Sequence, residues 1–207
     1  MIGKNLKPGM KACVFAVLIG VGAAGCRSVN VRIAEDATQR ASGTVAVFPL
    51  DDRRAENVAT DFTVYGRTGG QGSGPVVSRQ ISRAFESCSD WRSVAQSDMT
   101  RMMREERLSL RDLAALDPDR ACVLARRLKA DVVVMGRVLT YRTSWFLFVP
   151  RSKVFFEARG LDTETCKEIW AATAGDSSFF RTESEIVDDL AERIVGGIQS
   201  QLRRTGK

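Results

Sequence analysis

The chain has 207 residues, a formal net charge of +6 and no histidine. The absence of histidine excludes a Ser-His-Asp triad, acid–base catalysis by an imidazole and a histidine-ligated metal site. Basic residues are scattered along the chain rather than gathered in one stripe, which argues against nucleic acid as a partner. No motif indicates a small-molecule substrate or a cofactor, so we predict that the protein is not an enzyme.

The N-terminus has the pattern of a lipoprotein signal peptide. Three lysines precede an apolar run over Ala12–Ala24, which is shorter than the about 20 residues of a transmembrane helix. Small residues then lead into Cys26, although Ala23 stands where lipoboxes usually have leucine. This pattern predicts export, cleavage before Cys26 and lipidation of that cysteine, which would bind the protein to a membrane. Plain secretion with a chance cysteine is the alternative.

The signal divides the chain into three predicted segments. Residues 1–25 are the signal peptide, residues 26–43 are the lipidated cysteine and a polar tether, and residues 44–207 form a single domain. Arg27 follows the cysteine where an aspartate would direct retention in the inner membrane. By resemblance to enterobacterial sorting, this residue implies the periplasmic side of the outer membrane.

The first half of the domain alternates strands with helices. Thr44–Leu50 is a short apolar run rich in β-branched residues, typical of a strand buried on both faces. Gly74 precedes a helix whose apolar stripe ends at Cys88. Trp91–Ala95 is a second strand, and two further helices follow, the later one capped by Asp117.

The second half of the domain is predicted to be a meander of three strands and a final helix. The strands are expected over residues 131–141, 153–161 and 168–174. Thr182 and Glu185 have the spacing of a capping box at the start of the helix. The order β-α-β-α-α-β-β-β-α predicts an α/β fold, with a mixed sheet and helices packed on it.

Five consecutive large apolar residues lie at the predicted tip of the hairpin between the first two meander strands. They are Trp145, Phe146, Leu147, Phe148 and Val149. An apolar cluster at an exposed tip is a candidate contact for an envelope protein partner or for self-association. The alternative is that the long loop 51–74 of the same domain covers these side chains.

Three cysteines remain besides Cys13 in the signal and the lipidated Cys26. Cys88, Cys122 and Cys166 lack the Cys-x-x-Cys spacing of a zinc or thioredoxin-like site. The periplasm is oxidising, so a disulfide is expected there. The predicted topology places Cys88 and the turn with Cys166 at one end of the strands and Cys122 towards the other end. We therefore predict a Cys88–Cys166 bond.

Four segments, taken in order, resemble the curli secretion channel (CsgG-like) superfamily of outer-membrane lipoproteins and its relatives that activate penicillin-binding proteins or assist exopolysaccharide export. They are residues 45–52 (VAVFPLDD), residues 81–106, residues 128–141 (LKADVVVMGRVLTY) and residues 162–170 (DTETCKEIW). In the last segment Cys166 replaces the glycine of the family's turn, at a position that favours positive φ. The resemblance implies the fold and a cell-envelope setting, but fold alone does not determine function.

Length distinguishes this chain from the pore-forming relative, which spans the outer membrane with two extra β-hairpins per subunit. A spanning strand needs about 9–11 residues, and residues 175–181 leave no room for the second hairpin. The leading prediction is a non-catalytic docking or assembly module of the cell envelope. The alternatives are a ring-forming accessory subunit of a secretion or polysaccharide-export apparatus and, less favoured, an enzyme.

Overall fold

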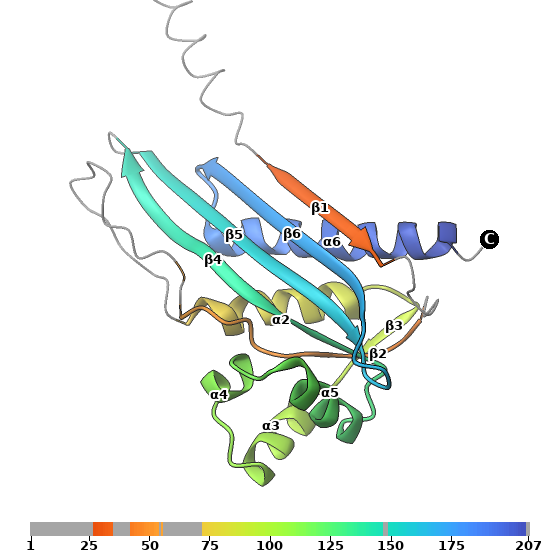
Figure 1. Ribbon diagram of the computed structural model, residues 1–207. Coiled ribbons are helices and arrows are strands. Elements are labelled where there is room, and N and C mark those ends of the chain that lie inside the picture. Colours follow the sequence, from red (N-terminus) through yellow and green to blue (C-terminus); the bar gives the residue numbers. More distant parts are fainter. Residues whose placement is uncertain (1–26, 35–41, 54, 56–71, 147–148, 206–207) are drawn as a thin grey trace, which may run out of the picture.

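A computed structural model describes residues 27–34, 42–53, 55, 72–146 and 149–205. This part of the chain forms a six-stranded mixed sheet with helices packed on it (Figure 1), which confirms the predicted α/β class. The signal peptide and Cys26 lie outside the described residues. None of the helices in the described ranges combines the length and apolar character needed to cross a membrane.

The sheet has the strand order β1-β6-β5-β4-β2-β3. The strands are β1 (Ser28–Ile33), β2 (Gly43–Val47), β3 (Trp91–Ser93), β4 (Val132–Phe146), β5 (Val149–Asp162) and β6 (Glu168–Phe179). β2 is parallel to β3 and β4, whereas β4, β5, β6 and β1 form antiparallel pairs. β4 and β5 are longer than predicted, because their pairing continues as far as Phe146 and Val149.

Strand β1 corrects the predicted tether. Residues 28–33 pair along their whole length with β6, so they belong to the domain. Val29, Val31 and Ile33 pack on the core, and the residues between them are exposed. This alternation is typical of a half-buried strand, and it is visible in the sequence of the predicted polar tether.

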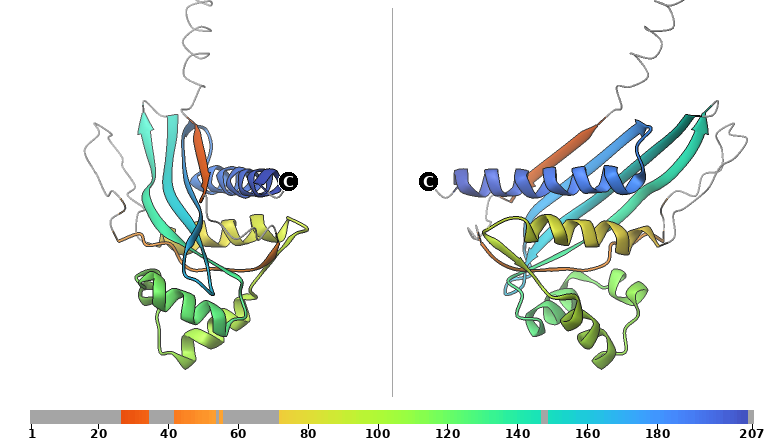
Figure 2. Two further views of the ribbon diagram at one scale, coloured as in Figure 1. Left: turned by 45° about the vertical axis from the view of Figure 1, so that its right-hand side comes forward. Right: turned by 180° about the vertical axis from the view of Figure 1, so that it is seen from behind.

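The helices form two groups on opposite faces of the sheet (Figure 2). They are α2 (Ser73–Glu86), α3 (Gln96–Glu105), α4 (Leu110–Ala114), α5 (Pro118–Arg127) and α6 (Glu183–Thr205). The predicted caps are confirmed: Asp117 accepts a hydrogen bond from the Arg120 amide, and Thr182 and Glu185 bond to each other's backbone N–H. Helix α4, of only five residues, was not predicted from the sequence.

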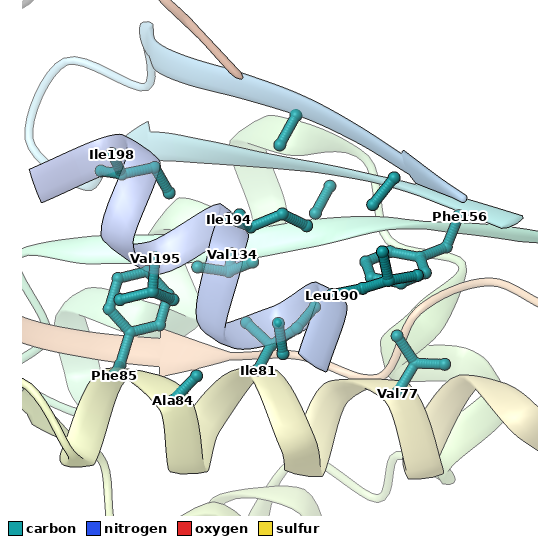
Figure 3. Close-up of a cluster of buried hydrophobic side chains, with 14 of the residues drawn as sticks. Val77, Ile81, Ala84, Phe85, Val134, Phe156, Leu190, Ile194, Val195 and Ile198 are labelled. Atoms are coloured by element: carbon teal, nitrogen blue, oxygen red, sulfur yellow. The ribbon is translucent and has the colours of Figure 1, made fainter. Parts of the chain in front are cut away.

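Helices α2 and α6 bury the larger core cluster against the sheet. Figure 3 shows Val77, Ile81 and Phe85 of α2 directed towards the same space as Leu190 and the following turns of α6. All four of these side chains are at most 1 % exposed. The second cluster joins α3, α4 and α5 to β2, the start of β4 and the end of β5. The apolar stripe predicted for α2 therefore does face the core, and the helices cover two sides of one sheet.

Two glycines in the meander are required by close approach of neighbouring groups. A Cβ on Gly136 would overlap the carbonyl oxygen of Glu157 on β5. A Cβ on Gly160 would overlap the indole ring of Trp170, its cross-strand partner on β6. Trp170 is fully buried in this space. Gly136 and Trp170 both belong to the segments that carry the family resemblance. Close packing is thus a physical reason for a glycine at position 136 and for a tryptophan at position 170.

The predicted Cys88–Cys166 bond is wrong. Cys166 is bonded to Cys122, with the two Cα atoms 6.0 Å apart, and Cys88 is free. Cys88 packs against the α2–α6 cluster, whereas Cys166 packs against the cluster of α3, α4 and α5, so the sheet lies between them. The prediction located both cysteines at the same end of the strands, but it did not determine on which face of the sheet each one lies. Cys166 does have positive φ, at 55°.

Candidate functional site

Much of the sheet is covered by helices on one face only. Helices α2 and α6 cover that face, and among the described helices α3, α4 and α5 cover the other face only near β2 and the adjoining ends of β4 and β5 (Figure 2). In β5, alternate residues from Ser152 to Ala158 are buried, and those between them are half-buried or exposed. We call the less covered side of β4, β5 and β6 the open sheet face.

The open sheet face is strongly basic. Its side chains include Arg137 and Arg142 of β4, Arg151, Lys153, Phe155, Glu157 and Arg159 of β5, and Thr173, Ser177 and Phe179 of β6. In this set only Glu157 carries a negative charge. Its carboxylate accepts a hydrogen bond from Arg137 Nε at 2.7 Å, and this bond raises the pKa of Arg137 above its usual value. Asp51 and Glu168 line the same face near α4, and the remaining excess of positive charge makes the face complementary to an acidic surface.

Near helix α4 the open sheet face deepens into a cavity of about 540 Å³. Its lining includes two ion pairs, Arg53 with Asp51 and Arg137 with Glu157. Within the described residues, no group of three or more His, Cys, Asp or Glu side chains could hold a metal ion. The cavity therefore presents paired charges and short apolar side chains, which suit recognition of a polar surface.

A network of arginines and aspartates lies at the other end of the long strands. Asp176 of β6 is only 3 % exposed, and its Oδ2 accepts hydrogen bonds from Arg27 Nε and Arg181 Nη1, both at 3.2 Å. Arg27 also forms an ion pair of 3.2 Å with Asp189 of α6. A buried carboxylate needs such partners, because desolvation of an unpaired charge is costly. We call these four residues the Arg27–Asp176 network.

The Arg27–Asp176 network was not predicted from the sequence. Arg27 and Asp176 are 149 positions apart, and their contact depends on the pairing of β1 with β6. The sequence did contain one indication, Asp176 itself. It lies two positions after Ala174 and four after Ala172, and therefore on the same, buried side of β6. A charged residue on a buried side predicts a charged partner.

An acidic patch lies on the other side of the sheet, at the start of α6. Acidic residues are concentrated in the first three turns of α6: Glu183, Glu185, Asp188, Asp189 and Glu192. Arg193 neutralises part of this charge through an ion pair of 3.1 Å with Asp189. This acidic patch lies on the face of the sheet opposite the open sheet face, whereas the last turn of α6 carries Arg203 and Arg204.

The predicted contact residues lie at the end of the long β4–β5 hairpin. The backbones of Trp145 and Phe146 pair with Pro150 and Val149, which confirms the predicted hairpin. Leu147 and Phe148 lie outside the described residues, as does most of the loop 51–74. Val149 is half-buried. That this tip contacts a partner stays a prediction.

No protein-family model matches the chain, and no curated protein matches it in sequence. Among solved structures, the chain is similar to the PelC dodecamer from Paraburkholderia phytofirmans, with a TM-score of 0.52 and 15% identity over 84% of this chain and 98% of that chain. A second PelC structure gives a TM-score of 0.51 and 16% identity over 84% of this chain and 99% of that chain. At these identities the similarity establishes a shared fold.

A weaker likeness is to the lipoprotein GNA1162 from Neisseria meningitidis. The TM-score is 0.49, with 19% identity over 76% of this chain and 98% of that chain. The C-terminal domain of LpoB from Escherichia coli gives a TM-score of 0.43 and 12% identity over 65% of this chain and 82% of that chain. The fold is thus an α/β fold shared with PelC, and the basic open sheet face is its candidate functional site.

Proposed function

We propose that this protein is a non-catalytic docking module of the bacterial cell envelope, attached by a lipid on Cys26 to the periplasmic side of the outer membrane. The open sheet face is the observation that carries the docking function. An antiparallel sheet with one solvated face usually carries mixed polar residues there. This face instead carries a large excess of positive charge with the aromatic rings of Phe155 and Phe179 among it.

Aromatic and arginine side chains are enriched at protein interfaces, and charge complementarity selects the partner. An acidic surface on another envelope protein therefore fits the open sheet face. The ion-paired arginines and carboxylates along it recognise charge and offer no activated nucleophile. The envelope setting is supported by the signal pattern and by the sequence resemblance to the CsgG-like superfamily.

The docking surface can be tested by crosslinking in cells. A photoreactive amino acid at Lys153, which pairs with Arg142 across the strands, should give one discrete crosslinked product. The same amino acid at Arg104, exposed on α3, is the matched control. We expect Arg142→Glu to reduce the Lys153 product at least about tenfold, since reversing one buried interface charge costs more than about 1.4 kcal/mol. Equal products from the two sites would contradict docking through this face.

A second candidate function is a subunit of a ring. The basic open sheet face and the acidic patch of α6 lie on opposite sides of one domain, and head-to-tail contact between two different surfaces generates rings when the rotation closes. PelC, which shares the fold, is described as a dodecamer. Lys153→Glu should then reduce the mass of the assembly, and Lys153→Glu combined with Asp188→Lys should restore it. A monomeric mass for the unsubstituted protein would refute this candidate.

A further inference from the structure

The chain is held tightly to the domain immediately after the predicted lipidation site. Arg27 directly follows Cys26 in the sequence, and its guanidinium binds Asp176 and Asp189, each at 3.2 Å. From Ser28 onward the backbone pairs with β6, beginning opposite Gly175. Consecutive Cα atoms are about 3.8 Å apart. A lipid on Cys26 would therefore start one residue from the folded domain, with no spacer between them.

The same end of the domain presents an aromatic ring to solvent. β1 begins, β6 ends and the β4–β5 hairpin ends at this side of the molecule (Figures 1 and 2). Phe180 follows β6 and is 77% exposed, compared with 44% for Leu110 and 43% for Val123, the other large exposed hydrophobic residues in the described ranges. A single exposed ring is ordinary on a protein surface. The backbone conformation of Phe180 is a second observation that sets this ring apart.

Phe180 is held in a conformation that bulky residues rarely adopt. Its φ is 65°, in the left-handed region. Its N–H donates to the carbonyl oxygen of Pro150 at 3.1 Å, and two residues later Thr182 begins the cap of α6. Strained residues persist only where the surrounding structure holds them, and they are concentrated at functional positions. The ring is thus directed outward from a fixed position.

Basic side chains lie at the same end of the sheet. The guanidinium carbon of Arg151 lies 5.4 Å from the centroid of the ring of Phe179, the residue before Phe180, and Arg142 lies four residues before the end of β4. Aromatic rings favour the headgroup level of a bilayer, and arginine side chains favour anionic lipid headgroups. The exposed Phe180 ring and the arginines of the neighbouring strands are therefore the groups at this end that suit a membrane surface.

We propose that Arg27, Phe180 and the neighbouring Phe179 and Arg151, which together we call the anchor end, rest on the bilayer that holds the lipid, with the Phe180 ring among the headgroups. This proposal rests on lipidation of Cys26 as part of the proposed function. It orients the domain: helices α3, α4 and α5 lie farthest from the membrane (Figure 1). The strands of the open sheet face then point away from the bilayer, so that this face is turned towards other proteins in the same membrane.

The test measures how close position 180 comes to lipid in the full-length lipidated protein. The protein is reconstituted into vesicles of phosphatidylethanolamine and phosphatidylglycerol that contain lipids brominated on the acyl chain. Phe180→Trp is compared with the matched control Val123→Trp on α5, and the unsubstituted protein gives the background of the native tryptophans. We expect bromolipid to quench the added Phe180→Trp fluorescence at least threefold more than the Val123→Trp fluorescence, with a shift to shorter wavelength.

Flotation of the same vesicles separates this proposal from the lipid anchor. Protein that floats normally while Phe180→Trp is quenched no more than Val123→Trp would overturn the contact of the anchor end with the bilayer and leave the anchor intact. Failure to float, together with no lipid label on Cys26, would overturn both proposals. Circular dichroism spectra that match the unsubstituted protein establish that the two variants fold.

Discussion

The disulfide between Cys122 and Cys166 affects stability in two opposite ways, because it cross-links the chain and because Cys166 is held at positive φ. The disulfide links residues 44 positions apart. The chain-entropy relation gives about 4 kcal/mol for a closed loop of that length, at the upper end of the typical range of about 2–4 kcal/mol. At φ 55° Cys166 adds a strain of about 1 kcal/mol that a glycine would not have.

Two substitutions at the same residue separate these contributions. Cys166→Ser removes the bond and keeps a side chain at positive φ, so we expect a loss of about 2–4 kcal/mol. Cys166→Gly removes the bond and relieves the strain, so the loss should be smaller by about 1 kcal/mol. The reduced, unsubstituted protein should resemble Cys166→Ser.

Urea unfolding without a reducing agent measures these differences, in a Cys26→Ala background that avoids lipid. Peptide mapping of the unsubstituted protein without reduction should recover Cys122 and Cys166 in one linked fragment. Recovery of both as free thiols from periplasmic protein would refute the reasoning. Equal stability of Cys166→Ser and Cys166→Gly would refute the strain contribution alone.

Three further predictions concern packing, charge and the anchor. Gly160→Ala should destabilise the domain by about 1–3 kcal/mol, because the new methyl group overlaps the buried indole of Trp170. Gly196→Ala in α6 meets nothing within 4 Å and should stabilise the domain by up to about 1 kcal/mol. Thermal unfolding of the two variants checks these opposite signs. In the folded protein, the hydrogen bond from Arg203 lowers the pKa of Asp90 below its ordinary value. The stability that this bond contributes is therefore present above the ordinary carboxyl pKa and is lost as the pH falls through the lowered pKa. Arg203→Gln should raise the Asp90 pKa in a titration followed by nuclear magnetic resonance, and an unchanged pKa would exclude this cause. Cys26→Ala should abolish membrane retention and labelling by a palmitate analogue, and equal label on both proteins would disprove lipidation.

Edge strand β1 illustrates what pattern reasoning overlooked. The alternation of Val29, Val31 and Ile33 with polar residues is visible in the sequence, but the segment follows directly after the predicted signal peptide and is short. A short alternating segment becomes a strand only when a partner is available. Its partner, β6, lies more than 130 positions later in the chain, so the pairing was not a local property.

The candidate site was predicted only in part for a related reason. The hairpin that carries Trp145 was predicted, because the apolar run is bounded by two strand patterns. The basic character of the open sheet face was not, because its charges come from three strands and become neighbours only in the antiparallel register. The scattered arginines of the sequence gather on one face once the sheet forms.

The sequence by itself determined the local elements of this protein: the capping box at Thr182, the Asp117 cap, the apolar stripes of α2 and α6 and the central strand β4. Each depends on interactions among residues a few positions apart, so local chemistry suffices. Only the tertiary structure decided which face of the sheet each helix covers, and hence that Cys166 meets Cys122, that Arg27 meets Asp176 and that the described helices leave much of one face of the meander uncovered. These contacts depend on packing between segments far apart in the chain, where burial of the whole apolar surface outweighs any local preference.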